Sequence, residues 1–254
     1  MHGGEIIKEF KEKLRVVFEC LEESIFPAHC PCCDKIAEGK YGICDTCLKT
    51  LGLVKKPYCM KCGKHIENED EELCKACMEH PRSYEFGFPL LSYDSVSAPI
   101  MYDIKYNNKR DYVKVFAKMI QTKWGKKIKS LDIDCIMPIP VHSYRLRQRG
   151  YNQAEVLAKN LSVYLGIRME TKILLRCKNT KAQKELGPKE RLENLKEAFV
   201  CDKAADVSGM GIKNVLLVDD IYTTGSTIEA CTFALKGLGV KKVYYTSICI
   251  VEQV

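Results

Sequence analysis

The sequence predicts an α/β protein in which a cysteine-rich segment precedes a parallel sheet flanked by helices. The first observation is the apolar run at residues 215–218, which is typical of a strand buried on both faces of a parallel sheet. The second is the alternation of apolar strands with amphipathic helices after residue 86. The third is a series of cysteine pairs before residue 80, which indicates a separate region stabilised by metal.

The chain begins with a predicted amphipathic helix over residues 1–28, where apolar residues recur at a spacing of three to four. A helix lying on a membrane surface would carry a basic polar face, whereas this one mixes acidic and basic residues. We therefore expect the helix to dock on the rest of the protein.

Composition predicts a cytoplasmic protein. The 254 residues contain no apolar run near the length of about eighteen needed for a membrane span, and no apolar block of a signal peptide. The 15 cysteines are therefore expected to be reduced and available to metal. Residues 1–90 hold 13 Lys and Arg against 16 Asp and Glu, but residues 91–254 hold 27 against 17. The positive part suits a polyanionic ligand, although a solvated basic surface is the ordinary alternative.

Four C-x-x-C pairs follow the first helix, separated by ten or eleven residues. Two such turns supply the four thiolates of a closed, structural zinc site, so we interpret residues 29–85 as a double zinc ribbon with two Zn²⁺ ions. A redox dithiol normally occurs once, after a strand, and fits this repetition poorly. The simplest arrangement joins the first and second C-x-x-C pairs in one zinc site and the third and fourth in the other, but the spacing also allows a crossed arrangement. The expected ligands are Cys30, Cys33, Cys44, Cys47, Cys59, Cys62, Cys74 and Cys77, with Cys32 to spare.

The zinc ribbon contains an acidic run at residues 67–72, interrupted only by Asn68. Such a surface disfavours direct binding to phosphates, so we favour a structural or docking function for this region. Contact with a nucleic-acid backbone through Lys55, Lys56, Lys61 and Lys64 is the alternative.

Residues 86–254 alternate between predicted strands and helices. Lys105 lies on one of these helices and is expected to be exposed, with a ligand contact as the rarer alternative. The predicted strands are 86–93, 134–141, 167–174, 215–218 and 243–251, and the predicted helices are 96–106, 112–124, 154–165 and 228–238.

A basic loop is predicted after the strand at 134–141. It places Arg145, Arg147 and Arg149 near the carboxyl edge of the sheet, where guanidinium groups can hold a pyrophosphate. Solvated arginines are the alternative. A second long polar segment, residues 176–194, is expected to close over the site as a lid.

The stretch after the run at 215–218 carries the strongest signal for chemistry. Asp219 and Asp220 end the strand, where open α/β sheets bind ligands. Small residues lead into the next helix, whose free N–H groups form a phosphate cradle with the neighbouring hydroxyls. Adjacent acids suit sugar hydroxyls or the outer ligands of Mg²⁺. Simple capping of the helix is the alternative. The loop residues are Thr223, Thr224, Gly225, Ser226 and Thr227.

This stretch resembles the 5-phosphoribosyl-1-pyrophosphate (PRPP) motif of type I phosphoribosyltransferases. The resemblance implies a phosphoribosyltransferase-like domain over residues 86–254, which binds PRPP together with Mg²⁺. Asp219 and Asp220 would then hold the ribose hydroxyls, and residues 223–227 the 5′-phosphate. Arg145 and Arg149 would hold the pyrophosphate.

The whole pattern resembles the ComF family, double-zinc-ribbon homologues of these transferases linked to natural competence and DNA uptake. The resemblance rests on the leading helix ending at Phe26-Pro27, the cysteine pairs, the segment 149–153 and the PRPP motif. It also rests on Thr180, Gln183, Arg191 and Asn194.

Two functions are compatible with this resemblance. In the first, the protein transfers phosphoribosyl from PRPP to a nitrogen acceptor. In the second, it uses the phosphoribosyl site only as a ligand sensor and binds single-stranded DNA or docks on a partner, for which a DNA-translocation helicase is the candidate. Tyr144, Tyr151 and Tyr222 could stack on bases, or serve as core residues. Type I relatives also suggest a homodimer.

Overall fold

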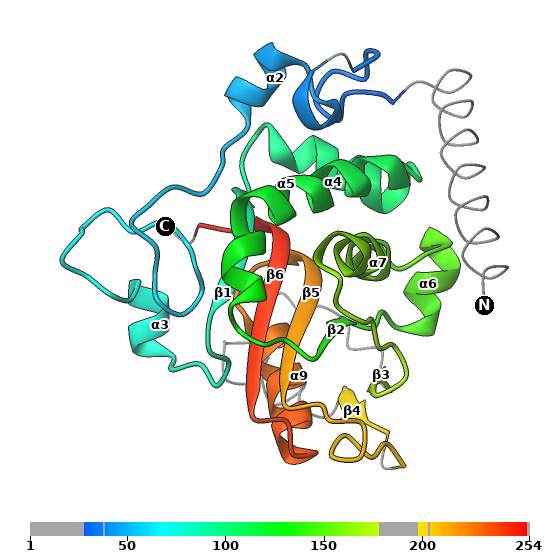
Figure 1. Cartoon of the computed structure of the whole chain (residues 1–254). Helices are drawn as coiled ribbons and strands as arrows, with labels where there is room; N and C mark the ends of the chain where they lie inside the picture. The colour runs from blue at the N-terminus through cyan, green and yellow to red at the C-terminus, as the bar shows by residue number, and fades with distance from the viewer. Residues whose placement is uncertain (1–27, 38, 178–197, 203, 253–254) are drawn as a thin grey trace, which may run out of the picture. The chain divides into compact units, whose positions relative to one another are not determined.

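The structure, a computed structural model, describes residues 28–37, 39–177, 198–202 and 204–252 (Figure 1). The chain divides into two compact units, Met1–Lys49 and Thr50–Val254. The helix predicted over residues 1–28 lies outside the described residues, except for its last position, and the boundaries near 28 and 85 stay predictions. Among the described helices, none is both long and apolar enough to cross a membrane.

The described part of the first unit is built around a turn that carries the first cysteine pair. Cys30 donates its N–H to the Lys35 carbonyl and accepts from Asp34 N–H, both at 2.8 Å. The short helices η1 (Lys40–Gly42) and α2 (Asp45–Thr50) follow, and α2 carries Cys47.

The second unit contains a four-stranded, all-parallel sheet in the order β1-β6-β5-β2. Apolar residues fill the central strand β5 from Val215 to Val218, and all four are fully buried. This burial on both faces is what the uninterrupted apolar run requires. The strands are β1 (Gly87–Ser92), β2 (Cys135–Pro138), β5 (Asn214–Tyr222) and β6 (Lys242–Ile250).

Helices cover both faces of the sheet, as predicted for this fold class. Figure 1 shows α4 (Ser97–Tyr106), α5 (Arg110–Lys129) and α7 (Gln153–Leu165) on one side and α9 (Ser226–Gly237) on the other. Each helix buries an apolar stripe and leaves charged residues in solvent. The predicted parallel sheet with flanking helices is confirmed.

The segment that carries the third and fourth cysteine pairs lies along the outer edge of β1. Val54 N–H donates to the Leu90 carbonyl at 3.0 Å, Gly87 N–H to the Lys61 carbonyl at 2.8 Å, and Ser92 N–H to the Gly52 carbonyl at 2.7 Å. These bonds satisfy an edge that would otherwise be unpaired. They also attach the second ribbon, with its helix α3 (Lys75–Glu79), to the sheet.

The prediction of a basic loop after β2 is wrong, because residues Ser143–Arg149 form a helix, α6. Both ends carry specific caps. The His142 side chain accepts a hydrogen bond from Tyr144 N–H, and Gly150 ends the helix in the left-handed conformation at φ 73°. Glycine reaches this conformation without steric cost, so residues 142–150 contain their own start and stop signals.

The strand expected over 167–174 is also wrong in its extent. Met169 forms only an isolated parallel bridge with Ile136, and β3 (Leu174–Arg176) pairs antiparallel with β4 (Phe199–Cys201) in a separate sheet. The Glu170 carboxylate accepts from Lys172 N–H at 2.7 Å, and this local turn diverts the chain away from β2. Most of the predicted lid, with Thr180, Gln183, Arg191 and Asn194, lies outside the described residues.

Candidate functional site

Asp219 and Asp220 lie on the last part of β5, where the apolar run ends. The Asp219 carboxylate accepts from Asp220 N–H at 2.9 Å, and the Asp220 carboxylate accepts from Ile221 N–H at 2.7 Å. Lys105 of α4 places its Nζ 3.3 Å from Asp220 Oδ2, and only 20% of its side chain is exposed. The lysine expected to be exposed is therefore a partner of the paired acids.

The two acids differ in their electrostatic surroundings. Burial of the Asp219 carboxyl, together with the nearby charge of Asp220, raises the pKa of Asp219 to about 8. Asp220 has the Lys105 ammonium as its ion-pair partner. The raised pKa of Asp219 keeps a proton on one of the two adjacent carboxyl groups. A ligand that replaces this proton can be a cation, and the carboxyl oxygens can also accept hydrogen bonds from hydroxyl groups.

The five small residues that follow form the turn into α9. Gly225 is the N-cap with φ at 78°, and a Cβ atom there would meet the Tyr222 hydroxyl at 2.2 Å. The Thr224 and Ser226 hydroxyls lie 3.0 Å apart. Ser226 and Thr227 are the first residues of α9, whose initial N–H groups have no acceptor within the helix. The turn therefore gathers hydroxyls and free N–H groups beside the paired acids.

The helical geometry of α6 separates the three arginines. Arg145 and Arg149 are one helical turn apart and half-buried, whereas Arg147 lies between them in sequence and is exposed. Arg149 donates to the buried Gln153 side chain at 3.2 Å and lies 5.4 Å from the Tyr106 ring centroid. The structure thus groups the two arginines predicted to hold pyrophosphate and turns the third away.

Arg176, at the end of β3, is a basic residue near the paired acids that was predicted only as part of the lid. Burial, together with the Arg145 guanidinium, lowers the pKa of Arg176, and the nearby Asp219 acts in the opposite direction. Arg176 therefore lies near both Arg145 of α6 and Asp219. The position of Arg176 directly after a predicted strand could have indicated that it lies near the site. The antiparallel pairing of β3 with β4, which turns Arg176 inward, was not predicted.

Two of the three tyrosines considered for base stacking belong to the core. Tyr151 and Tyr222 are buried, and only Tyr144 is exposed. The Tyr222 ring stacks on Tyr245 with centroids 4.8 Å apart and its hydroxyl bonds to that of Tyr84 at 2.9 Å. The stacking interpretation is therefore wrong for Tyr151 and Tyr222.

The eight paired cysteines form two clusters in the sequential arrangement, with the candidate ligand sulfurs of each cluster within 4.8 Å of one another. The Sγ atoms of Cys33 and Cys44 are 3.8 Å apart, and those of Cys62 and Cys74 are 3.7 Å apart. Four sulfurs at about 2.3 Å from a tetrahedral zinc ion would be separated by about 3.8 Å. Both clusters therefore fit Zn²⁺ as closed, structural sites.

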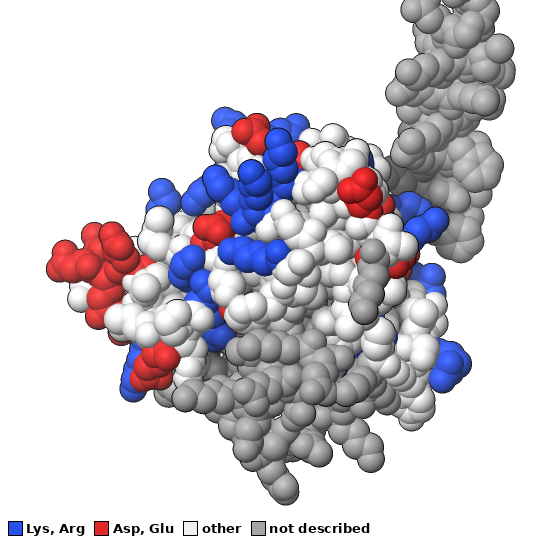
Figure 2. Space-filling view, turned by 90° about the horizontal axis from the view of Figure 1, so that it is seen from below, with Lys and Arg blue, Asp and Glu red and all other residues white. Residues whose placement is uncertain are grey.

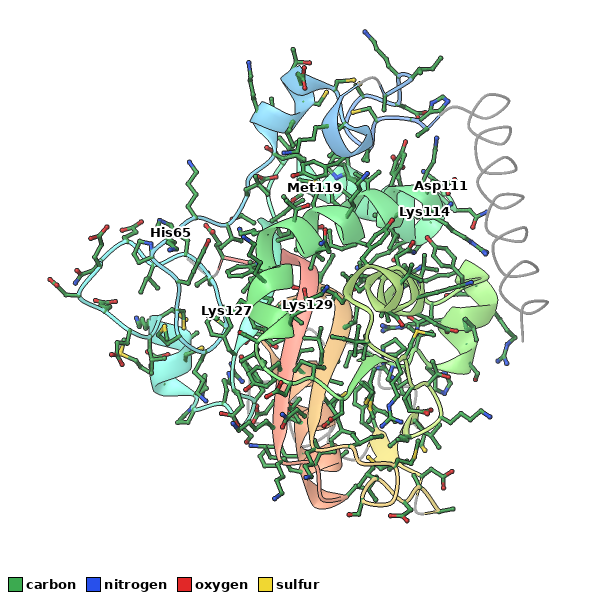
Figure 3. All side chains as sticks on the ribbon, in the orientation of Figure 1. His65, Asp111, Lys114, Met119, Lys127 and Lys129 are labelled. Carbon is green, nitrogen blue, oxygen red and sulfur yellow. The ribbon has the colours of Figure 1, made fainter. Side chains whose placement is uncertain are left out.

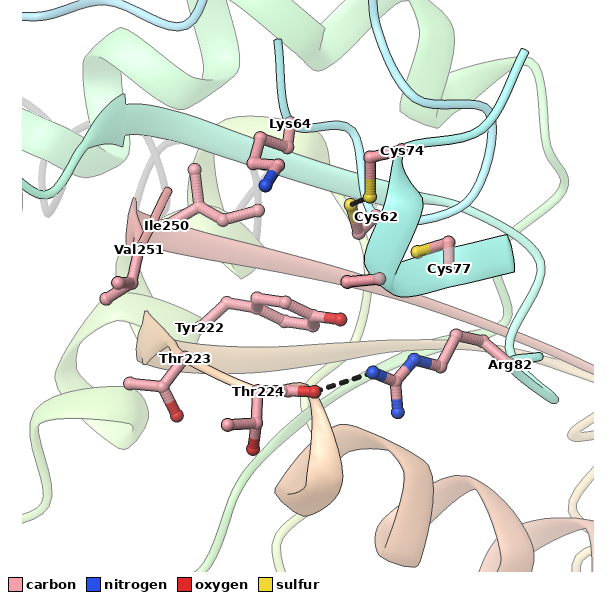
Figure 4. Close-up of a pocket in the computed structure, with 11 residues that line it drawn as sticks. Cys62, Lys64, Cys74, Cys77, Arg82, Tyr222, Thr223, Thr224, Ile250 and Val251 are labelled. Carbon is pink, nitrogen blue, oxygen red and sulfur yellow. Dashed lines mark hydrogen bonds between the residues drawn. The ribbon is translucent and has the colours of Figure 1, made fainter. Parts of the chain in front are cut away.

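The second cluster is the more deeply buried, with all four cysteines inside the core. Hydrogen bonds from the Cys62, Cys74 and Cys77 thiols hold the pKa of Cys59 well below its ordinary value. A small pocket runs from this cluster to the turn before α9 (Figure 4). Its lining includes Lys64, Arg82, Tyr222, Thr223 and Thr224.

The fold and the two cysteine clusters define a class, an α/β protein that carries a double zinc ribbon. Residues 21–78 match the family described as "Double zinc ribbon domain". The solved structure titled "Crystal structure of purine phosphoribosyltransferase from Pyrococcus horikoshii Ot3" aligns with 56% of this chain and 72% of that chain, at a TM-score of 0.32 and 18% identity. A likeness at this level says nothing about activity.

Curated relatives define the family more narrowly. Competence protein F of Haemophilus influenzae is 30% identical over 207 residues, which cover 80% of this chain and 88% of that protein. DNA utilization protein YhgH of Escherichia coli K12 is 25% identical over 84% of this chain and 92% of its own length, and competence protein ComFC of Bacillus subtilis is 25% identical over 74% and 75%. This chain belongs to the ComF family.

Metal analysis of single-cysteine variants tests the two clusters. We expect about two zinc ions per chain in the wild type and about one in each of Cys44→Ser and Cys74→Ser, because a closed site needs all four thiolates. Cys32→Ser is the matched control and should keep both ions. Loss of zinc from the Cys32 variant would contradict the assignment of ligands.

The raised pKa of Asp219 predicts a dependence of stability on pH. The folded protein keeps a proton on this carboxyl up to about pH 8, whereas the unfolded chain releases it near its ordinary value of 3.8. Stability from this group therefore falls as the pH rises through that window. We expect Asp219→Asn to raise the melting temperature by several degrees at about pH 8 and by less at about pH 5. Asp111→Asn, at an exposed position, serves as the control, and an equal gain at both pH values would contradict the raised pKa.

Proposed function

We propose that this protein binds PRPP with Mg²⁺ at the carboxyl end of β5 and acts in the cytoplasm in DNA uptake. The observation that carries the proposal is the direct succession of two partly buried acids and a hydroxyl-rich turn at the start of α9. Sugar hydroxyls and a phosphate on one small ligand need these two kinds of group side by side.

Each part of PRPP has candidate partners at this site. Asp219 and Asp220 accept the ribose 2′- and 3′-hydroxyls, and the turn at 223–227 holds the 5′-phosphate with hydroxyls and N–H groups. Arg145 and Arg149, which share one side of α6, bind the pyrophosphate. The carboxylate oxygens are also suitable outer ligands for Mg²⁺, which when bound neutralises charge on the pyrophosphate.

If the site is catalytic, the reaction is displacement at C1 of the ribose. A nitrogen nucleophile forms the new C–N bond as the C–O bond to pyrophosphate breaks, and pyrophosphate leaves with the bonding electrons. The residues named above position the ribose and stabilise the negative charge of the leaving group, so no covalent enzyme intermediate is required.

The role in DNA uptake is extended from the relatives, whose names are competence protein and DNA utilization protein. Membership of the ComF family supports this extension, because the matched segments span most of both chains. A DNA-translocation helicase as partner and a homodimer remain predictions.

Titration calorimetry with PRPP and Mg²⁺ tests the proposed ligand. We expect binding to the zinc-loaded wild type and a loss of at least about a hundredfold in affinity for Asp219→Ala/Asp220→Ala, because both proposed partners of the ribose hydroxyls are removed. Asp111→Ala, an acid exposed on α5, is the control and should bind as the wild type does. Absence of binding to the wild type would overturn the proposal.

A second candidate function is binding of single-stranded DNA or of a partner without turnover, and the lysines at the end of α5 favour it. Lys126, Lys127 and Lys129 are exposed in the last turn of that helix, and Figure 3 labels the latter two. Figure 2 shows basic side chains gathered on part of one face, apart from a group of acidic ones. By contrast, Lys123 donates to the Val54 carbonyl, and burial lowers its pKa to about 8.

The salt dependence of DNA binding tests this second function. If the three exposed lysines contact phosphates, replacing them together with Gln should weaken binding and reduce the slope of log affinity against log salt by about two. A double variant of Lys159 and Lys172, which are exposed elsewhere, is the charge control. An unchanged slope in the triple variant would exclude this surface.

A further inference from the structure

The chain that leaves the second cysteine cluster contacts the back of the proposed phosphate loop. Arg82, five residues after Cys77, donates from Nη2 to the Thr224 carbonyl at 2.7 Å, as the dashed line in Figure 4 shows. The Arg82 side chain is partly buried, and its Nε is shielded from solvent with no hydrogen-bond partner among the described residues. A guanidinium fixed in this way holds one peptide of the loop.

The held peptide is the one that joins Thr224 to Gly225. In a trans peptide the carbonyl and the following N–H point in opposite directions. The Arg82 bond therefore turns the Gly225 N–H away from the ribbon. The glycine is confined as well, since its left-handed backbone packs against the Tyr222 hydroxyl. Arg82 thus sets the direction of a donor in the turn that begins α9.

The same segment, residues 82–84 (the linker), also bonds to α9 near both ends of that helix. Both carboxylate oxygens of Glu229 lie 2.9 Å from Ser83 N–H, and Glu229 is only 2% exposed. The Lys236 ammonium donates to the Ser83 carbonyl at 2.6 Å. Both backbone groups of Ser83 are therefore bonded to α9, through two charged side chains about two turns apart on the helix.

A third connection passes through buried tyrosines. Tyr245 of β6 donates its hydroxyl to the carbonyl of Cys62, a candidate zinc ligand, at 2.7 Å. Its ring stacks on Tyr222, which immediately precedes the loop. Tyr84 of the linker bonds to the Tyr222 hydroxyl and packs edge-on against the Tyr245 ring. The cluster, the linker and the loop therefore share one packed core.

From these contacts we infer that the second cysteine cluster is a positioning element of the ligand site, with Arg82 as the positioning residue. Metal at Cys59, Cys62, Cys74 and Cys77 holds the linker, and the linker holds the loop in its ligand-binding geometry. The first cluster lies in the other compact unit and has no such function in this inference. The consequence for PRPP rests on the proposed function, but the effect on the loop does not.

Hydrogen exchange of the free, zinc-loaded protein tests the positioning directly. In Arg82→Gln we expect faster exchange at the amides of residues 222–229 than in the wild type, with both zinc ions retained. Arg168→Gln is the matched control. Like Arg82, Arg168 donates from its guanidinium to backbone carbonyls, in its case those of Asp134 and Met210. Its exchange at 222–229 should stay as in the wild type. Equal exchange in the two variants would overturn the inference.

Calorimetry with PRPP and Mg²⁺ extends the test to the ligand. Arg82→Gln should weaken binding by about tenfold or more, since a bond to a charged donor is lost, and Arg82→Lys should recover part of the affinity. Cys74→Ser, with one zinc ion left, should weaken binding, whereas Cys44→Ser should not. If the wild type binds no PRPP, the proposed function fails, and the exchange result still decides the positioning. If PRPP binds equally to all four variants, the inference fails while the proposed function stands.

Discussion

The site depends on two carboxylates placed at the end of a strand that is buried on both faces. Four fully buried residues bring β5 through the middle of the sheet, so the first polar residues after them appear at its carboxyl edge. That position withdraws Asp219 from solvent and raises its pKa, and it draws the Lys105 ammonium of α4 to Asp220. Two cations lie near these acids, Lys105 beside Asp220 and Arg176 near Asp219.

The same edge collects groups of opposite charge from distant parts of the chain. Arg145 and Arg149 come from α6, Arg176 from the end of β3, and the N–H groups from the start of α9. Acids beside basic side chains and free N–H groups suit a ligand with both hydroxyls and phosphates better than a simple anion. A polyanion alone would leave the two acids without hydroxyl partners and would meet the Asp220 carboxylate as a repulsive neighbour, which is why PRPP is proposed ahead of DNA for this site.

The second ribbon, which carries Cys59, Cys62, Cys74 and Cys77, is packed into the core of the α/β unit and is not a separate metal-binding module. Its cysteines pack in one cluster with residues of β5, β6 and α9, and its backbone covers the free edge of β1. Loss of metal there would expose an unpaired edge and loosen the turn before α9 at once. Stability of the sheet and order at the ligand site are therefore properties of the same set of contacts.

The local sequence was sufficient to predict those structural elements whose signals come from residues close together in the chain. The apolar run with its acids, the C-x-x-C spacing and the helical stripes each depend on neighbours within about ten residues. Strand β5, the two cysteine clusters, helices α4, α5, α7 and α9, and the turn before α9 agree with these patterns. Caps at His142 and Gly150 make α6 a helix, and these local signals were outweighed by the expectation of a basic loop. Contacts between residues far apart in sequence were decided only by the tertiary structure. The Arg82 bond to Thr224, the Lys105 pair with Asp220 and the inward turn of Arg176 arise from packing across the sheet, and no local pattern encodes which distant partner a long cation will meet.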